Sequence, residues 1–222
     1  MSQQPTPSHS TEATPHQGGL LSASFIGVML AQFLGTLNDN VFRYFIVFLG
    51  ATQIEKDLAI SVGTAAFTLP YLFFATVAGW LADRFSKQKV IVYLKSLEII
   101  FMALGLAGIW LQNIYFLFAV VALTGCQCAL FGPAKFGALP EILKPEKLSI
   151  ANGLMGLVTV VGTAMGVVMG AVLFERSGVS LKSPITVEQI HEVAAFLMGL
   201  GVVGFIFTLI IKPLPPADPE RK

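Results

Sequence analysis

Four polar residues in the first long apolar run have the types and spacing to bind a charged ligand. They are Gln32, Thr36, Asp39 and Arg43. Because they recur at intervals of four, three and four, a helix would place them on one face. An ionised carboxylate at the centre of a bilayer costs at least ~2.5 to 3.5 kcal/mol, so Asp39 must pair, line a wet cavity or take up a proton.

Arg43 lies one helical turn beyond Asp39 and is its nearest candidate partner. In a binding site, the Asp39 carboxylate would suit an amine and the Arg43 guanidinium a phosphate. The alternative is an internal ion pair that only holds this helix against its neighbours.

A second polar pair, Lys95 and Glu98, lies in a later apolar run. The two residues are three apart and are therefore neighbours on a helix surface. Lys95 is close enough to the start of its run to reach the cytoplasmic boundary, whereas Glu98 lies too deep. Glu98 is therefore the stronger functional candidate, and a purely structural pair with Lys95 is the alternative.

The sequence offers no Ser/His/Asp set, metal-ligand cluster or phosphate-binding glycine loop, so we expect neither an enzyme nor a bound metal or cofactor. Cys126 and Cys128 lie in an apolar run and are interpreted as small buried apolar residues. The net charge is +1, and the 14 basic residues are scattered between apolar runs. This pattern argues against nucleic acid as a partner.

Composition determines the elements that must position these residues. Hydrophobic residues make up 55% of the chain and charged residues 12%, which indicates lipid as the main solvent. A helix needs ~20 mostly apolar residues to span a bilayer, and backbone polar groups in lipid must pair within the helix. The sequence therefore predicts an all-α membrane protein with six transmembrane helices, at 20–49, 59–82, 90–111, 114–131, 150–174 and 193–211.

The two terminal segments of the chain are expected to be cytoplasmic. Residues 1–19 are rich in Ser, Thr, Pro and Gln, which predicts a disordered tail before the bundle of residues 20–211. Residues 212–222 are polar and proline-rich, as expected for the start of a linker.

The basic residues of the connections predict the orientation, because cytoplasmic loops carry an excess of Lys and Arg. One side would hold nine: Arg84, Lys87, Lys89, Lys135, Lys144, Lys147, Lys212, Arg221 and Lys222. The other side would hold three: Lys56, Arg176 and Lys182. Both termini are therefore predicted to be cytoplasmic.

Glycines at regular spacing in the last two runs predict close helix packing. The positions are Gly162, Gly166 and Gly170 in one run and Gly199, Gly201 and Gly204 in the other. Small residues at such intervals let helices approach closely, which both static packing and the rocking motion of a transporter require.

A charged turn joins the second and third runs at residues 79–89. It resembles the signature loop of the major facilitator superfamily, Gly-x-Leu-Ala-Asp-Arg-x-Gly-Arg-Lys, although Ser86 replaces the second glycine and Gln88 the second base. The resemblance implies one half of that superfamily's fold, with a conformational gating loop. The residues assigned to the loop are Gly79, Asp83, Arg84 and Lys87.

Residues 131–141, in the connection expected after the fourth run, read FGPAKFGALPE, and ANGL follows at 151–154. With the Asn-Asp-Asn of residues 38–40, these strings are similar to the lysophospholipid transporter branch of the superfamily, whose members are sometimes fused to an acyltransferase and an acyl-carrier-protein synthetase. The alternative for the loop is that Pro133 and Pro140 merely break helices while Lys135 and Glu141 face water.

The resemblance implies a carrier that moves lysophospholipid, chiefly lysophosphatidylethanolamine, to the inner leaflet of the bacterial inner membrane for re-acylation. Its substrate-binding candidates are Asn38, Asp39, Asn40, Arg43, Glu98 and Lys135. Two alternatives remain: a carrier of another amphipathic or drug-like solute, and a non-transporting membrane module of an acyltransferase fusion.

Members of this superfamily have two six-helix bundles, and only one is present here. A lone bundle would expose the polar face around Asp39 to lipid, so we expect a second six-helix half as a partner, with an acyltransferase as a further possible partner. A truncated or split reading frame is the favoured explanation. The others are a half-transporter that pairs with itself or another half, and a segment detached from a fusion enzyme.

Overall fold

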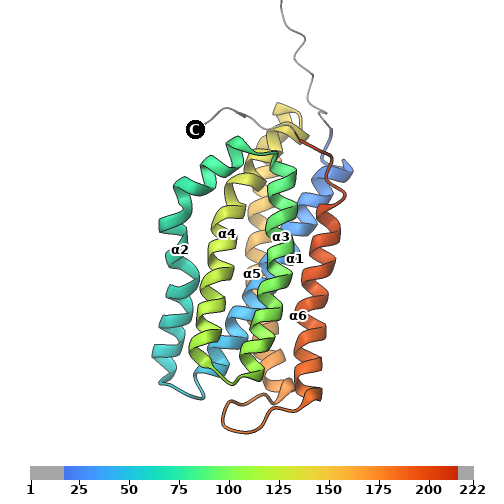
Figure 1. Cartoon of the computed structure of the whole chain (residues 1–222). Helices are drawn as coiled ribbons and strands as arrows, with labels where there is room; N and C mark the ends of the chain where they lie inside the picture. Colours follow the sequence, from blue (N-terminus) through green and yellow to red (C-terminus); the bar gives the residue numbers. More distant parts are fainter. Residues whose placement is uncertain (1–17, 215–222) are drawn as a thin grey trace, which may run out of the picture.

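The computed structural model describes residues 18–214, which form a bundle of long helices (Figure 1). These residues contain six α-helices and one short 3-10 helix: α1 (Ala23–Gly50), α2 (Lys56–Arg84), α3 (Lys87–Trp110), α4 (Ile114–Ile142), η1 (Pro145–Lys147), α5 (Leu148–Ser177) and α6 (Val187–Thr208). The predicted all-α class is confirmed. Most of the predicted tail and linker, at 1–17 and 215–222, lies outside the described residues.

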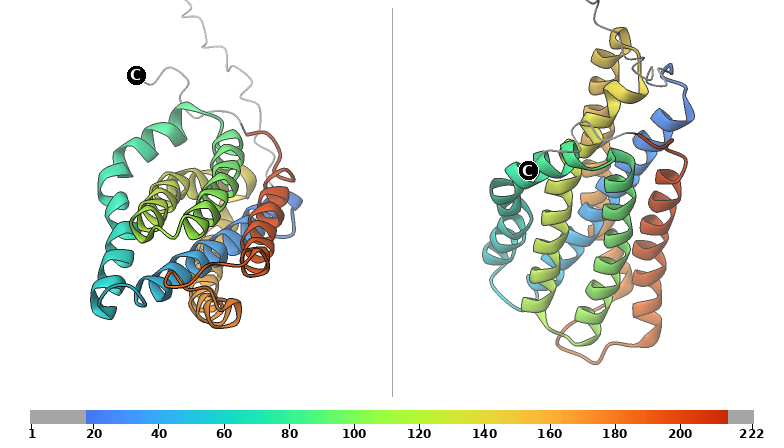
Figure 2. Two further views of the ribbon diagram at one scale, coloured as in Figure 1. Left: turned by 60° about the horizontal axis from the view of Figure 1, so that its bottom comes forward. Right: turned by 45° about the horizontal axis from the view of Figure 1, so that its top comes forward.

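Five of the described helices, α2 to α6, are long and apolar enough to cross a membrane. Helix α1 has 28 residues but is not among them, because its polar residues lower its hydropathy. It packs against α5, α6, α4 and α2, whereas α2 and α6 lie at opposite edges of the bundle (Figures 1 and 2). The neighbouring helices therefore shield the polar side chains of α1 from lipid.

Side-chain and glycine caps fix several helix ends. The Ser22 side chain accepts a hydrogen bond from the Phe25 amide at the start of α1. The Asn113 side chain likewise accepts one from the Phe116 amide at the start of α4. Thr186 and Gln189 form a capping box that begins α6. Gly178 ends α5 with a φ of 59°, a left-handed conformation that favours glycine.

Helix α4 differs most from the prediction. The expected connection from residue 131 is helical up to Ile142, with Pro133 and Pro140 inside the helix. The interpretation that these prolines break the helix is therefore wrong. Neighbouring helices make such prolines tolerable in membrane proteins, and Ala134 and Ala138 are fully buried against the bundle.

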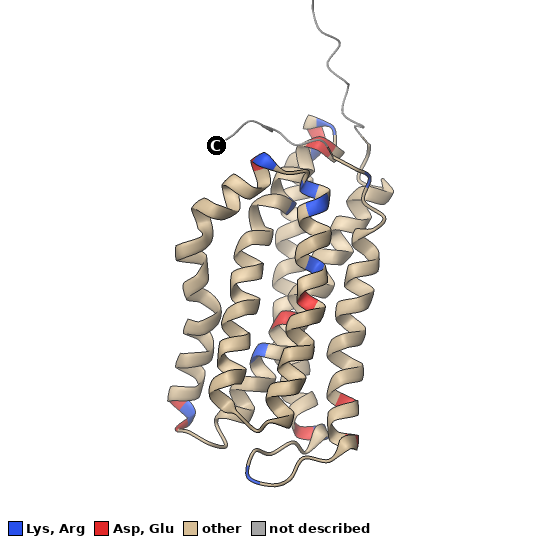
Figure 3. Ribbon diagram, viewed as in Figure 1, with Lys and Arg blue, Asp and Glu red and all other residues tan. Residues whose placement is uncertain are grey.

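The longer α4 also changes the charge count. Lys135 lies inside α4 and lines the interior cavity instead of the membrane boundary, so eight of the nine basic residues remain on the side predicted to be cytoplasmic. Eight against three still favours the same orientation. Figure 3 shows charged residues concentrated at the two ends of the bundle, with few in between.

The glycines of α5 lie directly against α1, as their spacing predicts. A Cβ on Gly166 would lie 2.5 Å from the Asn40 Cβ, and one on Gly170 would lie 2.8 Å from the Val41 carbonyl oxygen. The glycines of α6 differ: the nearest atoms to a Cβ on Gly201 would be 3.6 Å away, an ordinary contact. Of the two predicted glycine sets, the one on α5 therefore mediates close approach and the one on α6 does not.

The described parts of the two chain ends lie against the bundle. The Gly18 amide donates to the Ile142 carbonyl at 2.8 Å, and the Lys212 amide donates to the Ser24 hydroxyl at 3.1 Å. Leu214 is buried. These contacts tie both segments to the end of the bundle where α1 begins and α4 ends.

Candidate functional site

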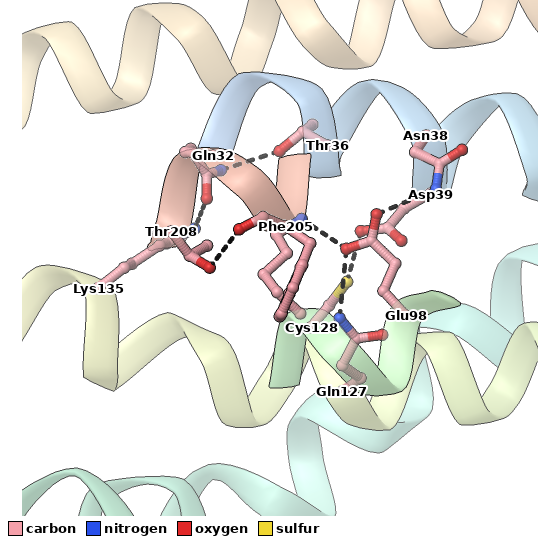
Figure 4. A network of polar contacts seen from close by, with 11 residues as sticks. Gln32, Thr36, Asn38, Asp39, Glu98, Gln127, Cys128, Lys135, Phe205 and Thr208 are labelled. Carbon is pink, nitrogen blue, oxygen red and sulfur yellow. Dashed lines mark hydrogen bonds and ion pairs between the residues drawn. The ribbon is translucent and has the colours of Figure 1, made fainter. Parts of the chain in front are cut away.

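A cavity of about 210 Å³ lies among α1 to α5. Its wall combines polar, charged and aromatic side chains: Ala31, Gln32, Gly35, Thr36, Asp39, Asn40, Arg43, Phe67, Tyr71, Lys95, Gln127, Cys128, Phe131, Lys135, Thr159 and Thr163. All four polar residues of the predicted α1 face are included. Polar side chains from five helices meet at this cavity, and Figure 4 shows the contacts around it.

Asp39 contacts a thiol and not the predicted guanidinium. Its Oδ2 accepts a hydrogen bond from Cys128 Sγ at 2.9 Å, whereas its Oδ1 is buried without a hydrogen-bond partner among the described residues. No ion pair with Arg43 forms, so that predicted pairing is wrong. The interpretation of Cys128 as a small apolar residue is also incomplete, because its thiol is a polar contact of the cavity.

Arg43 is held by neutral groups. Its Nη2 donates to Asn40 Oδ1 at 2.8 Å, and its guanidinium lies 4.7 Å from the centre of the Tyr44 ring and 4.6 Å from that of Phe67. Among the described residues, no carboxylate lies within 4.0 Å of it. The cavity therefore contains a guanidinium that can still donate hydrogen bonds to an anion.

Lys95 enters the cavity from α3 and does not extend to the membrane boundary. It is 2% exposed, and its Nζ lies 2.5 Å from Glu98 Oε2, so the predicted snorkelling is wrong. The side chain passes α1 at Gly35, where a Cβ would lie 2.0 Å from Lys95 Nζ. The predicted neighbour pair with Glu98 does form.

Glu98 lies behind the cavity wall and is 1% exposed. Besides Lys95, it accepts hydrogen bonds from Asn38 Nδ2 at 3.0 Å and from Gln127 Nε2 at 3.5 Å (Figure 4). Donors from α1, α3 and α4 thus surround one carboxylate. This arrangement fits a buried structural charge better than a direct ligand-binding group.

Gln32 connects three helices at the other end of the cavity. Its Oε1 accepts from Lys135 Nζ at 2.9 Å, and its Nε2 donates to Thr36 and Thr159 at 2.9 Å each. The Lys135 ammonium also lies 5.6 Å from the centre of the Phe131 ring. No carboxylate lies within 4.0 Å of Lys135 in the described part of the chain.

The charges of the cavity and its wall sum to an excess of one positive charge. Three cations, Arg43, Lys95 and Lys135, face two carboxylates, Asp39 and Glu98. No group of three or more potential metal ligands occurs among the described residues. Charge and aromatic rings therefore favour an anionic or zwitterionic organic ligand with an apolar part.

Comparison with known proteins identifies the family. Residues 12–222 match the sequence model of the Major Facilitator Superfamily. The chain belongs to this superfamily. It is a multi-pass membrane protein, and the predicted family resemblance is confirmed.

Within the Major Facilitator Superfamily, the chain is similar to proteins named lysophospholipid transporter LplT. It is 34% identical to that of Serratia proteamaculans (strain 568) over 208 residues, which cover 92% of this chain and 47% of the relative. It is 32% identical to that of Salmonella heidelberg (strain SL476) over 163 residues, which cover 73% of this chain and 39% of the relative. The chain thus spans about half, or less, of the length of the curated relatives that it matches. No solved structure matches it significantly.

The superfamily's signature loop lies at the end of the bundle, away from the cavity. Gly79, Asp83 and Arg84 belong to the last turns of α2, and a Cβ on Gly79 would meet nothing within 4 Å. Gly79 therefore makes no close helix contact within the described bundle. Arg84 lies over the Trp80 ring at 5.2 Å.

Lys87, the fourth residue assigned to the signature loop, begins α3 and is 5% exposed. It forms an ion pair with Glu141 at the end of α4. This pair links the loop to the α4 segment whose sequence resembles the superfamily's lysophospholipid branch. It also shows that Glu141 does not simply face water.

Four of the six predicted binding residues, Asp39, Asn40, Arg43 and Lys135, line the cavity. Asn38 and Glu98 lie behind its wall. The lining residues that the sequence interpretation did not assign to the site include Lys95, Gln127 and Cys128. A polar pattern on α4, with Gln127, Cys128 and Lys135 at intervals of one and seven, was the available signal.

Proposed function

We propose that this chain is the substrate-binding half of a lysophospholipid transporter and that its cavity holds the lipid headgroup. The relatives it matches carry that name, and the chain spans about half of their length. The observation that carries the proposal is the cavity itself: an unpartnered Asp39 oxygen lies in the same cavity as Arg43 and Lys135, the two cations without a carboxylate partner. These charges complement an amine and a phosphate.

In this proposal each group has a role. Asp39 Oδ1 accepts from the ethanolamine ammonium, while Arg43 or Lys135 donates to the phosphate. Asn40 orients Arg43 through its 2.8 Å hydrogen bond. The aromatic side chains Phe67 and Phe131 provide apolar surface beside the polar groups, which suits the glycerol and the start of an acyl chain. No bond is made or broken, so the chain acts as a carrier and not as an enzyme.

The proposal extends to the surroundings of the chain. The bundle lies in the bacterial inner membrane with both termini cytoplasmic, as eight basic residues against three favour. A second six-helix half covers the open side of the cavity, and the loop of Gly79, Asp83, Arg84 and Lys87 controls how the halves move. An acyltransferase that uses the delivered lipid is a further partner.

Binding of labelled lysophosphatidylethanolamine to the full chain in lipid nanodiscs tests the proposal. We expect saturable binding above that of empty nanodiscs, weakened roughly tenfold or more in Asp39→Asn because a charge-assisted hydrogen bond is lost. The matched control is Asp57→Asn, the same change at an exposed position near the start of α2, which should bind as the parent does. Binding equal to that of empty nanodiscs, or unchanged in Asp39→Asn, would refute the headgroup assignment.

Transport is measured separately, in vesicles from cells that express the chain with its second half. Labelled lysophosphatidylethanolamine should move between leaflets, and this movement should stop in Asp39→Asn. Equal movement of an unrelated cationic drug, with no competition by the lysolipid, would instead support a carrier of drug-like solutes.

A further inference from the structure

Two cations of the cavity, Arg43 and Lys135, have no carboxylate partner in the described part of the chain. The third cation, Lys95, is neutralised by Glu98 at 2.5 Å. Arg43 and Lys135 are half-buried, and their partners among the described residues are amide oxygens and aromatic rings. Removing a cation from water without a counter-charge is unfavourable, so each position is suited to receive an anion.

The two cations lie at opposite ends of the cavity. Lys135 contacts Gln32, and Arg43 is on the same helix eleven residues further along. At ~1.5 Å of rise per residue, this separation is about 16 Å along α1. The two cations therefore reach the same cavity from well-separated backbone positions and form two candidate positions for an anion.

Asp39 lies between them and faces the same cavity. It is seven residues beyond Gln32 and four before Arg43. Its Oδ1 is buried and has no hydrogen-bond partner among the described residues, which suits it to accept from a cation bound in the cavity. A ligand with one phosphate and one ammonium could therefore keep its ammonium near Asp39 while its phosphate contacts first one cation and then the other.

We propose that Arg43 and Lys135 are two successive binding positions for one phosphate ester, arranged on either side of Asp39. Arg43 is the position on the far side of the bundle from the signature loop, and Lys135 is the position nearer to it. The inference rests on the proposed function for the identity of the ligand as a lysolipid. The two positions themselves rest on the absence of carboxylate partners within residues 18–214 and on the separation of their backbone positions along the bundle.

Photochemical crosslinking of the full chain in nanodiscs tests the inference. The probe is lysophosphatidylethanolamine with a diazirine beside the phosphate, and crosslinked peptides are mapped by mass spectrometry. We expect two groups of crosslinks, one around Arg43 and Phe67 and one around Gln32 and Phe131. Arg43→Gln should reduce the first group roughly tenfold or more and leave the second, and Lys135→Gln should do the reverse.

Two controls separate charge from folding. Arg43→Lys keeps the positive charge and should retain both groups of crosslinks, with the thermal midpoint of each variant measured in parallel. If either glutamine variant abolishes both groups while the protein stays folded, the cavity has one site and the inference is wrong. If neither variant changes the pattern, Arg43 and Lys135 serve other partners, such as carboxylates of a second bundle, and the inference is also wrong.

A soluble competitor distinguishes this inference from the proposed function. Glycerophosphoethanolamine has the same headgroup chemistry without the acyl chain. If it competes as well as unlabelled lysophosphatidylethanolamine at both positions, the two positions stand and the lysolipid assignment fails. If the probe labels neither region of the parent chain, both proposals fail together.

Discussion

The Cys128 thiol on α4 donates to the Asp39 carboxylate on α1 across a distance of 2.9 Å. This contact is the only hydrogen bond to the Asp39 side chain among the described residues. It joins a carboxylate in the interior of the bundle to a helix that also carries Lys135. The orientation of the proposed amine ligand therefore depends on a cysteine.

Removal of this thiol should destabilise the fold and the site together. In Cys128→Ala, a buried carboxylate loses its donor, and we expect the free energy of unfolding to fall by about 1 to 3 kcal/mol. Cys128→Ser keeps a donor and should restore most of the difference. Cys126→Ala, two residues away, is the matched control and should have little effect. Equal midpoints of thermal unfolding for all three variants would contradict the role of the contact.

Gly35 should be intolerant of a side chain because of Lys95. A Cβ at this position would lie 2.0 Å from Lys95 Nζ, so Gly35→Ala must displace the ammonium from Glu98. We expect a loss of about 1 to 3 kcal/mol in unfolding free energy and weaker lysolipid binding. Gly153→Ala in α5, where a Cβ meets nothing within 4 Å, should be neutral or slightly stabilising. A Gly35→Ala protein as stable as this control would show that Lys95 relocates freely.

The ion pair between Lys87 and Glu141 should stabilise the end of the bundle near the signature loop. Lys87→Ala leaves a largely buried carboxylate without its partner, and we expect a loss of about 3 kcal/mol. The exchanged double variant, Lys87→Glu with Glu141→Lys, should recover part of that loss. Circular dichroism recorded during thermal unfolding measures the stability of both variants. No recovery in the exchanged variant would mean that geometry, and not charge, sets the contribution.

Close packing of α5 on α1 should make Gly166 sensitive to substitution. In Gly166→Ala the added methyl group would lie 2.5 Å from the Asn40 Cβ, so the helices must separate, at a cost of about 1 to 3 kcal/mol. Gly156→Ala, on the same helix, adds a methyl group with no neighbour within 4 Å. This control should keep or raise the unfolding midpoint. Similar midpoints for the two variants would argue against tight contact between α1 and α5.

Single-cysteine labelling in intact cells should establish the orientation. In a background without native cysteines, Glu146→Cys in η1 should react with a membrane-impermeant maleimide only after the cells are permeabilised. Ser183→Cys, between α5 and α6, should react in intact cells. Both positions are exposed, so access depends on the side of the membrane. The reverse pattern would place the basic end outside and refute the proposed topology.

Much of the fold could be predicted from the length and spacing of apolar runs. Helical spacing predicts that four polar residues share one face of α1, and all four line the cavity: Gln32, Thr36, Asp39 and Arg43. The end of α4 could not be predicted, because local rules treat Pro133 and Pro140 as helix breakers while packing against the bundle overrides that preference.

The partners of the cavity residues were harder to predict, because they depend on which helices are neighbours. Asp39 and Cys128 are 89 residues apart in sequence, and nothing local indicates their contact. The position of Lys95 along its helix suggested the membrane boundary, but the helix face on which it lies directs it inward. The Lys95 side chain fits there because position 35 on α1 is a glycine and has no side chain to exclude it.

The burial of α1 has a consequence for biogenesis. It is the first of the described helices to leave the ribosome, yet it is the one whose composition is least suited to lipid by itself. Its stable place exists only after α4, α5 and α6 have been synthesised, since these helices supply much of its surroundings. We therefore expect α1 to enter the lipid by itself less readily than the other described helices and to be stabilised there as they assemble around it.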